Sequence, residues 1–569
     1  MAGGMSERGT CMSDMKGRFR QCVCLLAVMS VLFSISACDE KTPTSVDTDQ
    51  SSMSGSREDG PLVPYPETIK MTRAEYASPI TTYIDGEDAA DNFITDFYRN
   101  KLNIVWDNAW SCAEDGYFSR LNLAIASGDL PDVFMVNASQ LKHLINADVI
   151  MDLTDVYETY ICDNLRTNIE YDDRLALSIP TVNGRLYAVP LTRVYEGSVG
   201  FLWLRTDWMQ KLGLQAPTTL EEFKDYVATV KESGIAGRGT SGFCFLGPGS
   251  AAFEGLAHAS GAYYDCWVRD DDGQSLVYST FRPEMRNALL NMQQMYRDGL
   301  IDRDFAVAGP LLFERMMAGQ YGILLGEFSY PAMLKYSVMS NPEATWDAFP
   351  VPLNPQAELR PQSDVFVSGY VVVRKDCAHP EALLKSMNLW AQVWLADGIY
   401  REWYTDQMVT TYNEVVNCGK YALPYFFEGV DSGIEIGRYI RSAYASGNPT
   451  EEIKKYPYAR MTYSYMADET APNFISGEGW SLKTVYMTSE RIFDEKYHTL
   501  QFNQFQGLLS NEATYYQNAL NQDIMETFID IIMGEDIDAF DRLAEDWEAG
   551  GGDKIKKEVN NWYHGQSRG

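Results

Sequence analysis

The sequence has 569 residues, which exceeds one ordinary domain and predicts at least two compact units. Hydrophobic residues make up 45% and charged residues 22%, a balance typical of a globular chain that can bury a large core. The net charge of −32 argues against nucleic acid or an anionic membrane surface as a partner, and it disfavours a highly acidic ligand unless a local basic site overrides the field.

The N-terminus, residues 1–37, has the pattern of an export signal. Three basic residues, Lys16, Arg18 and Arg20, precede an apolar run over residues 23–33, and small residues follow it. The run is too short for a membrane-spanning helix, which needs about 20 apolar residues. We therefore predict a signal peptide at this end of the chain.

Cys38 directly follows the small residues, an arrangement that resembles a bacterial lipobox. In that interpretation Cys38 is acylated, becomes the new N-terminus and attaches the protein to the membrane through its lipid. The alternative is an ordinary signal peptide that contains a cysteine. Met15 is the predicted start, because residues 1–14 fit no signal region. Residues 38–61 are poor in apolar side chains and predict a flexible tether after the lipidated cysteine.

Six further cysteines are widely spaced, with no CxxC pair and no spacing typical of a metal site. Two interpretations stay open for them: one disulfide, between Cys244 and Cys266, or scattered buried thiols. The six are Cys112, Cys162, Cys244, Cys266, Cys377 and Cys418.

Helical and strand patterns alternate along the rest of the chain, which indicates α/β layers. Short apolar runs predict strands over residues 102–106, 133–136, 186–190, 200–204, 321–325 and 371–373. Helical apolar spacing predicts helices over residues 92–102, 117–126, 139–146, 218 onward, 283–296 and 379–394, and over the tail from 523 with breaks near 534 and 550–552. Ser139 is the predicted N-cap of its helix.

The segment over residues 121–134 is a helix, a sharp turn and a strand. Gly128 permits a positive φ, Asp129 can bond its local backbone, and Pro131 restricts φ before the strand. This segment resembles the helix–turn–strand of the family 1 extracellular solute-binding proteins, the receptors of bacterial sugar importers.

Four other segments resemble the same family and occur in the same order. The last is similar to the C-terminal helices of the long oligosaccharide-binding lipoproteins. The four are residues 184–190, 203–223, 295–302 and 526–563.

The resemblance implies an α/β, two-lobed fold of the periplasmic-binding-protein type, with an interdomain cleft, a hinge and discontinuous lobes. One lobe is expected from residues 62–192 plus about 350–430, and the other from 193–349 plus about 431–569. The implied function is capture of a carbohydrate, such as an oligosaccharide, in the cleft and delivery to the permease subunits of an ABC transporter. The implied protein is extracytoplasmic, monomeric, without a cofactor and not an enzyme.

Two other functions stay open, a secreted polysaccharide-acting enzyme and a sensory or adhesion lipoprotein that uses the same cleft. Against the first, the sequence contains no nucleophile elbow, HExxH, P-loop or dinucleotide fingerprint. A glycosidase would need two carboxylates roughly 5–10 Å apart, which sequence spacing does not reveal.

The long members of the resembled family often carry a calcium loop after the helix that corresponds to residues 218 onward. The matching stretch, residues 231–240, has one carboxylate and two basic residues. Calcium takes 6–8 oxygen ligands, several of them carboxylates. We therefore predict no metal site there, and we interpret the acidic stretch 270–273 as a solvated turn.

A sugar offers apolar faces to aromatic rings and hydroxyl groups to polar side chains. The resemblance places candidate ligand contacts near the expected hinge, at strand ends and on aromatic residues that border the cleft. For each aromatic residue, packing in the core is the competing interpretation. The candidates are Trp106, Trp110, Asn137, Ser139, Tyr195, Glu196, Tyr263, Tyr264, Trp267, Glu327, Phe328, Tyr370 and Trp480.

Overall fold

The computed structural model describes residues 59–77, 87–88, 90–113, 116–192, 199–307, 309–353, 360–363, 367–395, 398–400, 403, 427, 432–449, 453, 457–471, 474, 476–497 and 499–566. The chain divides into two compact units, each assembled from separate segments. Unit 1 consists of Met1–Ile169, Pro180–Leu191 and Gly369–Phe427. Unit 2 consists of Glu170–Ile179, Thr192–Ser368 and Glu428–Gly569.

Unit 1 is built on a mixed five-stranded sheet in the order β2-β1-β3-β14-β6. β1 is parallel to β2 and β3, whereas β14 is antiparallel to β3. Parallel strands are usually covered by helices on both faces, and their side chains are mostly apolar. The strands are β1 (Ile69–Ala77), β2 (Ile104–Ala113), β3 (Val133–Val136), β6 (Val189–Thr192) and β14 (Val367–Val373).

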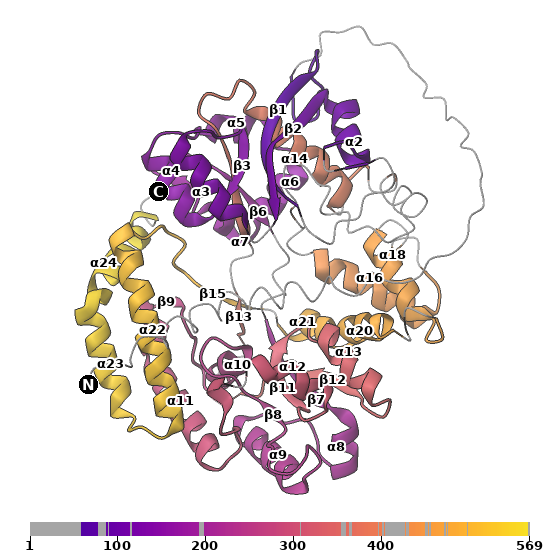
Figure 1. The fold of residues 1–569 in the computed structure, drawn as a ribbon, viewed down its shortest axis with the longest axis vertical. Coiled ribbons are helices and arrows are strands. Elements are labelled where there is room, and N and C mark those ends of the chain that lie inside the picture. The colour runs from indigo at the N-terminus through magenta and orange to yellow at the C-terminus, as the bar shows by residue number, and fades with distance from the viewer. Residues whose placement is uncertain are drawn as a thin grey trace, which may run out of the picture. The chain divides into compact units, whose positions relative to one another are not determined.

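Helices flank this sheet on both sides: α3 and α4 lie on one side and α2 and α14 on the other (Figure 1). Their ends follow local rules. Asn92 and Thr95 form a capping box at the start of α2, and Gly128 ends α3 in the left-handed conformation, as predicted. The helices are α2 (Phe93–Leu102), α3 (Tyr117–Ser127), α4 (Ala138–Asn146), α5 (Thr154–Tyr160), α6 (Asp163–Ile169) and α14 (Glu381–Trp394).

Unit 2 contains a four-stranded sheet in the order β12-β7-β11-β8. Trp203 of β7 is fully buried, and its Nε1 donates to the carbonyl oxygen of Glu327 at 3.1 Å. The strands are β7 (Gly200–Arg205), β8 (Phe243–Cys244), β11 (Ile323–Glu327) and β12 (Trp346–Phe349). The helices are α8 (Thr206–Leu212), α9 (Leu220–Ser233), α10 (Ala251–Ala259), α11 (Pro283–Arg297), α12 (Leu312–Met317) and α13 (Pro331–Ser340).

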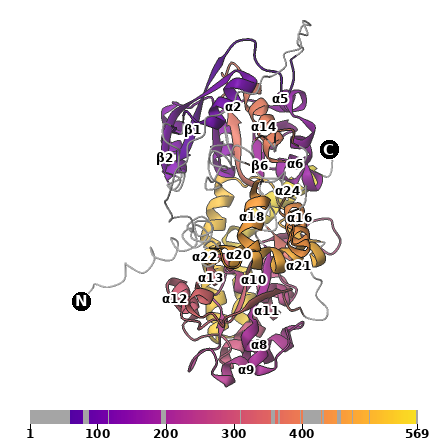
Figure 2. The same ribbon diagram turned by 90° about the vertical axis from the view of Figure 1, so that its right-hand side faces the viewer.

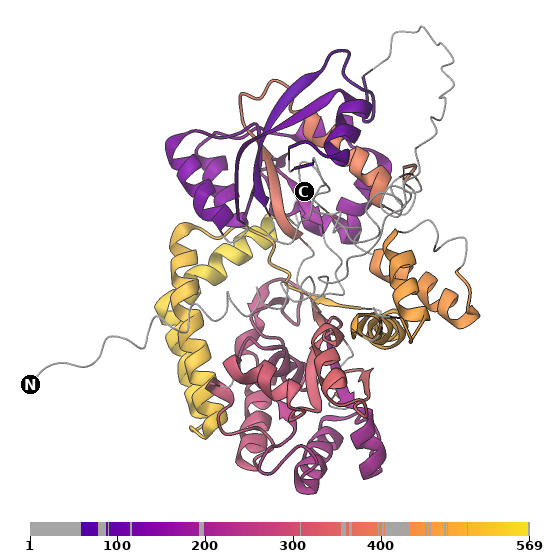
Figure 3. The same ribbon diagram turned by 45° about the vertical axis from the view of Figure 1, so that its right-hand side comes forward.

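The C-terminal helices α22 (Asn511–Met533), α23 (Asp538–Trp547) and α24 (Asp553–Gln566) run side by side in unit 2 (Figure 3). α22 packs against α11, and the buried rings of Phe528 and Phe540 join the main core of the unit. A second group of helices lies together in the same unit (Figure 2), and it has a small core of its own. It consists of α16 (Ser432–Ser446), α18 (Pro457–Ala467), α20 (Glu478–Thr484) and α21 (Glu490–Lys496).

Several predicted elements need correction. The N-cap of α4 is Asn137, not Ser139, because the Asn137 side chain accepts from the Gln140 N–H and the Gln140 side chain accepts in return. The predicted strand over 186–190 is divided in two. Its first part belongs to a hairpin of β4 (Thr181–Val182) and β5 (Arg185–Leu186), whose two turn residues, Asn183 and Gly184, both have positive φ.

Of the two interpretations left open for the cysteines, the Cys244–Cys266 disulfide is wrong, because Cys244 carries a free thiol. This thiol is buried, and burial raises its pKa. Cys377 is likewise a free, buried thiol, whereas Cys418 lies outside the described residues. None of the described helices combines the length and the apolar character that crossing a membrane requires.

Candidate functional site

In unit 1 the candidate residues gather near the ends of neighbouring strands. Asn137 directly follows β3, and Tyr370 of β14 is paired with Val136 at the same end. Asn137 and Ser139 are exposed, whereas Tyr370 is buried. Oδ1 of Asn137 already accepts a hydrogen bond in capping α4. Its amide NH₂ group and the second lone pair of Oδ1 are therefore what it can offer a ligand.

The two candidate tryptophans of β2 are separated by an irregularity of the strand. Arg73 is opposite Asn108, but Ala74 is opposite Trp110, so β2 holds one extra residue there. Trp106 is buried and its Nε1 donates to Ser386 Oγ of α14 at 3.3 Å. The Trp110 ring packs instead on Tyr117 of α3, at a centroid distance of 5.3 Å.

Trp110 keeps features that suit a ligand platform. Its ring is half-buried, and the Arg120 guanidinium lies 5.3 Å from the ring centroid. Its Nε1 is shielded from solvent and has no hydrogen-bond partner among the described residues. A shielded N–H donor costs free energy until a partner or a water accepts from it.

A buried polar cluster next to these strands was not anticipated from the sequence. Arg73 Nε donates to Asn108 Oδ1 at 2.6 Å and Arg73 Nη2 to Glu75 Oε1 at 2.8 Å, while Asn108 Nδ2 also donates to Glu75. Burial raises the pKa of the Glu75 carboxyl, against the lowering effect of the Arg73 charge. The signal available in the sequence was a charged Arg-x-Glu pair at alternate positions of β1, on the same face as the apolar Ile69 and Met71.

In unit 2 the three candidate aromatics of the segment after α10 have different surroundings. Tyr264 and Trp267 are buried in the main core. Tyr263 is half-buried, and its hydroxyl donates to the carbonyl oxygen of Arg360 at 3.1 Å. Of the three, Tyr263 is the one that lines the cavity described next.

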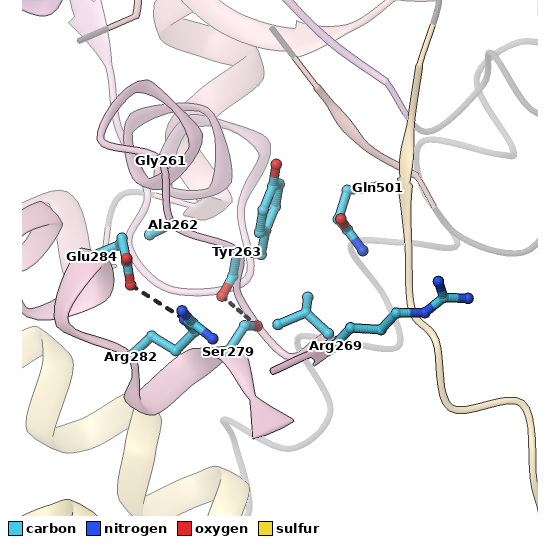
Figure 4. A pocket seen from close by; sticks show the side chains of 9 residues that line it. Gly261, Ala262, Tyr263, Arg269, Ser279, Arg282, Glu284 and Gln501 are labelled. Atoms are coloured by element: carbon cyan, nitrogen blue, oxygen red, sulfur yellow. Dashed lines mark hydrogen bonds and ion pairs between the residues drawn. The ribbon is translucent and has the colours of Figure 1, made fainter. Parts of the chain in front are cut away.

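This cavity has a volume of about 230 Å³ and combines two distant parts of the chain (Figure 4). One part surrounds the hairpin of β9 (Trp267–Arg269) and β10 (Leu276–Tyr278), and the other is Gln501 of β15 (Gln501–Phe502). Among the lining residues, Tyr263 alone is a candidate that the sequence predicted. The lining residues are Gly261, Ala262, Tyr263, Val268, Arg269, Ser279, Arg282, Glu284 and Gln501.

The remaining candidates of unit 2 do not line this cavity. Glu327 ends β11 and is half-buried, and its carboxylate accepts from Ser329 Oγ at 3.5 Å. Phe328 packs against the small core of α16, α18 and the π-helical turn at Val485–Ser489, and Trp480 is half-buried on α20. The candidates Tyr195 and Glu196, and the predicted lipidation site Cys38, lie outside the described residues.

In the stretch over residues 231–240, where no metal site was predicted, a lysine side chain bonds to the end of a neighbouring helix. Lys231 Nζ donates to the carbonyl oxygen of Asp298, the C-cap residue of α11, at 2.8 Å. The stretch 270–273 is the tight turn of the β9–β10 hairpin, with Gly273 N donating to Asp270 O at 2.8 Å. No group of three or more His, Cys, Asp or Glu side chains suited to a metal ion occurs among the described residues.

The model of the bacterial extracellular solute-binding protein family matches residues 83–396, more than half of the chain, and the chain belongs to this family. Lipoprotein LipO of Bacillus subtilis (strain 168) is 23% identical over 477 residues, which cover 81% of this chain and 86% of LipO. FusA, a fructooligosaccharide ABC transporter substrate-binding protein of Streptococcus pneumoniae serotype 4, is 24% identical over 211 residues, which cover 34% of this chain and 39% of FusA.

Another relative is YtcQ of Bacillus subtilis (strain 168), a polygalacturonan/rhamnogalacturonan-binding protein. It is 23% identical over 251 residues, which cover 42% of this chain and 47% of YtcQ. Among solved structures, the alginate-binding protein AlgQ2 without calcium ion has a TM-score of 0.54 at 14% identity, covering 89% of this chain and 100% of AlgQ2. FusA in complex with kestose has a TM-score of 0.54 at 17% identity, covering 88% of this chain and 100% of FusA. These likenesses confirm the predicted two-lobed α/β fold.

Proposed function

We propose that this protein is an extracytoplasmic solute-binding lipoprotein that captures a carbohydrate and delivers it, chemically unchanged, to the permease subunits of an ABC transporter. The observation that carries the proposal is membership of the solute-binding family, together with relatives named for fructooligosaccharide and polygalacturonan binding. The proposed ligand is an oligosaccharide, and the proposed assembly is a monomer.

The cavity of unit 2 supports a carbohydrate as the ligand. It offers the ring of Tyr263, which can stack on the apolar face of a sugar. Polar groups of Gln501, Arg269 and Glu284 border the same cavity and can bond hydroxyl groups. An apolar platform with a few polar groups around it is the usual composition of a small-molecule site.

Among the candidate residues of unit 1, we propose Trp110 and Asn137 as ligand contacts. Trp110 combines a half-buried ring with a shielded N–H donor, and Asn137 is exposed at the end of β3. Strand ends are where open α/β sheets bind ligands.

The proposed anchor is the lipid on Cys38. The likeness to a protein named Lipoprotein LipO supports it, as does the lipobox-like sequence before this residue. Substitution Cys38→Ser is expected to move the protein from the membrane fraction to the soluble fraction, followed by immunoblot. Unchanged membrane attachment of this variant would exclude the lipid anchor.

The test of ligand capture is a thermal-shift screen over neutral and acidic oligosaccharides, followed by calorimetric titration of each hit. We expect at least one oligosaccharide to raise the unfolding temperature and to bind with one site per chain. Chromatography of the ligand after long incubation should recover it intact. Conversion of the sugar to a product would instead establish the polysaccharide-acting enzyme, the alternative left open by the sequence.

A further inference from the structure

Arg269 is the charged residue of the unit 2 cavity that no acidic side chain neutralises. Its side chain is exposed, and it forms no ion pair with any of the residues that the structure describes. Arg269 ends β9, opposite Leu276 of β10, so the hairpin determines its position at the cavity. Its charge is therefore available to a ligand.

The other arginine of the cavity has its charge compensated. Arg282 Nη2 lies 2.8 Å from Asp271 Oδ1, its Nε lies 3.5 Å from Glu284 Oε2, and its Nη1 lies 3.8 Å from Asp270 Oδ1. In Figure 4 the Arg282–Glu284 pair lies on one side of the cavity, and the Arg269 side chain extends away from that pair on the other side, below Gln501. The charge of Arg282 is thus balanced by carboxylates of the protein, whereas Arg269 forms no ion pair with a described residue.

Tyr263 gives the cavity an aromatic side chain held in position. Its hydroxyl donates to the carbonyl oxygen of Arg360, and its own carbonyl oxygen accepts from Ser279 Oγ at 2.8 Å. A sugar ring that carries a carboxylate can stack on such a ring while its charged group reaches a guanidinium. Arginine matches a carboxylate with two parallel hydrogen bonds, which a neutral hydroxymethyl group cannot form.

We propose that the cavity bordered by Tyr263, Arg269 and Gln501 binds a uronic acid unit of an acidic oligosaccharide, with Arg269 holding its carboxylate. The inference rests on the proposed function and adds a ligand class to it. Arg269 supplies the local basic group that an acidic ligand needs in a chain of net charge −32.

The test uses trigalacturonate and its methyl ester, which has the same skeleton without the charges, titrated into the full exported chain. We expect trigalacturonate to bind, and Arg269→Gln to weaken its binding about tenfold or more, because a charge-assisted hydrogen bond is lost. The methyl ester should bind weakly to the wild-type protein and to the variant alike. Raising the salt concentration should weaken binding of the acid more than binding of the ester.

Arg238→Gln is the matched control, since Arg238 is exposed in the same unit, does not line the cavity and changes the net charge equally. Equal losses in the Arg238→Gln and Arg269→Gln variants would overturn the inference, because general electrostatics would then explain the binding. Binding of neutral oligosaccharides alone would also overturn it, while the proposed function would stand. Failure of every acidic and neutral sugar to bind would reject the proposed function as well.

Discussion

Lys385 Nζ donates to Asp59 Oδ1 at 2.6 Å, although the two residues are 326 positions apart in the sequence. The Lys385 side chain is 1% exposed, and the rings of Tyr65 and Tyr160 lie 5.1 and 5.3 Å from its ammonium group. Nζ also donates to the carbonyl oxygen of Val63 at 2.9 Å. The chain that leaves the predicted tether is thus attached to α14 of unit 1.

Substitution Lys385→Met is expected to lower the free energy of unfolding by about 2–3 kcal/mol, because it removes a buried hydrogen-bonded charge that organises residues 59–65. Urea denaturation measures the change. Lys375→Met is the control, since Lys375 pairs with Asp148 on the surface and should cost no more than about 1 kcal/mol. Equal effects of the two substitutions would contradict a special role of Lys385.

Asp59 should give this attachment a dependence on acid pH. Burial by itself would raise the pKa of the carboxyl, but hydrogen bonds from Lys385 and Tyr160 outweigh it and hold the pKa below its usual value. A lowered folded-state pKa stabilises the protein above the unfolded value of about 4, and this contribution disappears as the pH falls through the folded value. Asp59→Asn should therefore flatten the loss of stability below about pH 4, measured by denaturation at a series of pH values.

Arg205 and Asp207 form a buried ion pair in unit 2, with two hydrogen bonds of 2.6 and 2.7 Å. The Arg205 guanidinium also lies 5.0 Å from the centroid of the Trp208 ring. Asp207→Asn should lower the free energy of unfolding by about 3–5 kcal/mol, since it leaves a buried guanidinium without its counter-charge. The double variant Arg205→Met/Asp207→Leu should lose less than the single one. A larger loss in the double variant would show that the pair is net stabilising.

Chelation is expected to leave the protein unchanged. The stretch 231–240 carries Lys231 at the C-terminus of α11, where a positive charge is favourable. EDTA should therefore not shift the unfolding temperature, whereas Lys231→Met should lower stability by about 0.5–1 kcal/mol. A fall in the unfolding temperature with EDTA, reversed by calcium, would contradict the prediction of no metal site.

Tyr263 should contribute to ligand binding through its ring. With any oligosaccharide found by the screen, Tyr263→Ala should weaken binding about tenfold and Tyr263→Phe by less than about threefold, because phenylalanine keeps the stacking face. Calorimetric titration measures both. Tyr515→Ala is the control, since Tyr515 is 72% exposed on α22. An unchanged affinity of Tyr263→Ala would remove the cavity from the ligand site.

Elements set by short-range rules could be predicted well. The helix predicted from residue 218 onward is α9, and Thr219 and Glu222 cap it reciprocally. The stop of α3 at Gly128 was also predictable, because glycine takes the left-handed conformation at little cost. The cap of α4 was assigned two residues too late, because Asn137 and Ser139 are both good caps and only the reciprocal bond to Gln140 distinguishes them.

The candidate site was harder to predict, because it depends on contacts between distant segments. Tyr263 could be named as an aromatic near a strand, but Gln501 joins its cavity through the pairing of β15 with β13 (Gln362–Ser363). Arg269 looked like any surface arginine. Only the structure distinguishes Arg269 from the neighbouring Arg282. Arg282 forms ion pairs with Asp270 and Asp271, and these pairs depend on where the turn 270–273 places the two carboxylates.

By itself, the sequence determined the periodic helices and strands and the family, since these depend on residues close together or on a linear order of motifs, and it predicted an export signal and a lipidation site. The tertiary structure decided which neighbouring elements the side chains on each face of a strand or helix contact. The extra residue in β2 moves Trp110 to the α3 side while Trp106 stays beside α14, although both are aromatic residues of one strand. Side chains alternate across a strand, so a single inserted residue reverses the face of all that follow, and only the pairing partner reveals where the insertion lies.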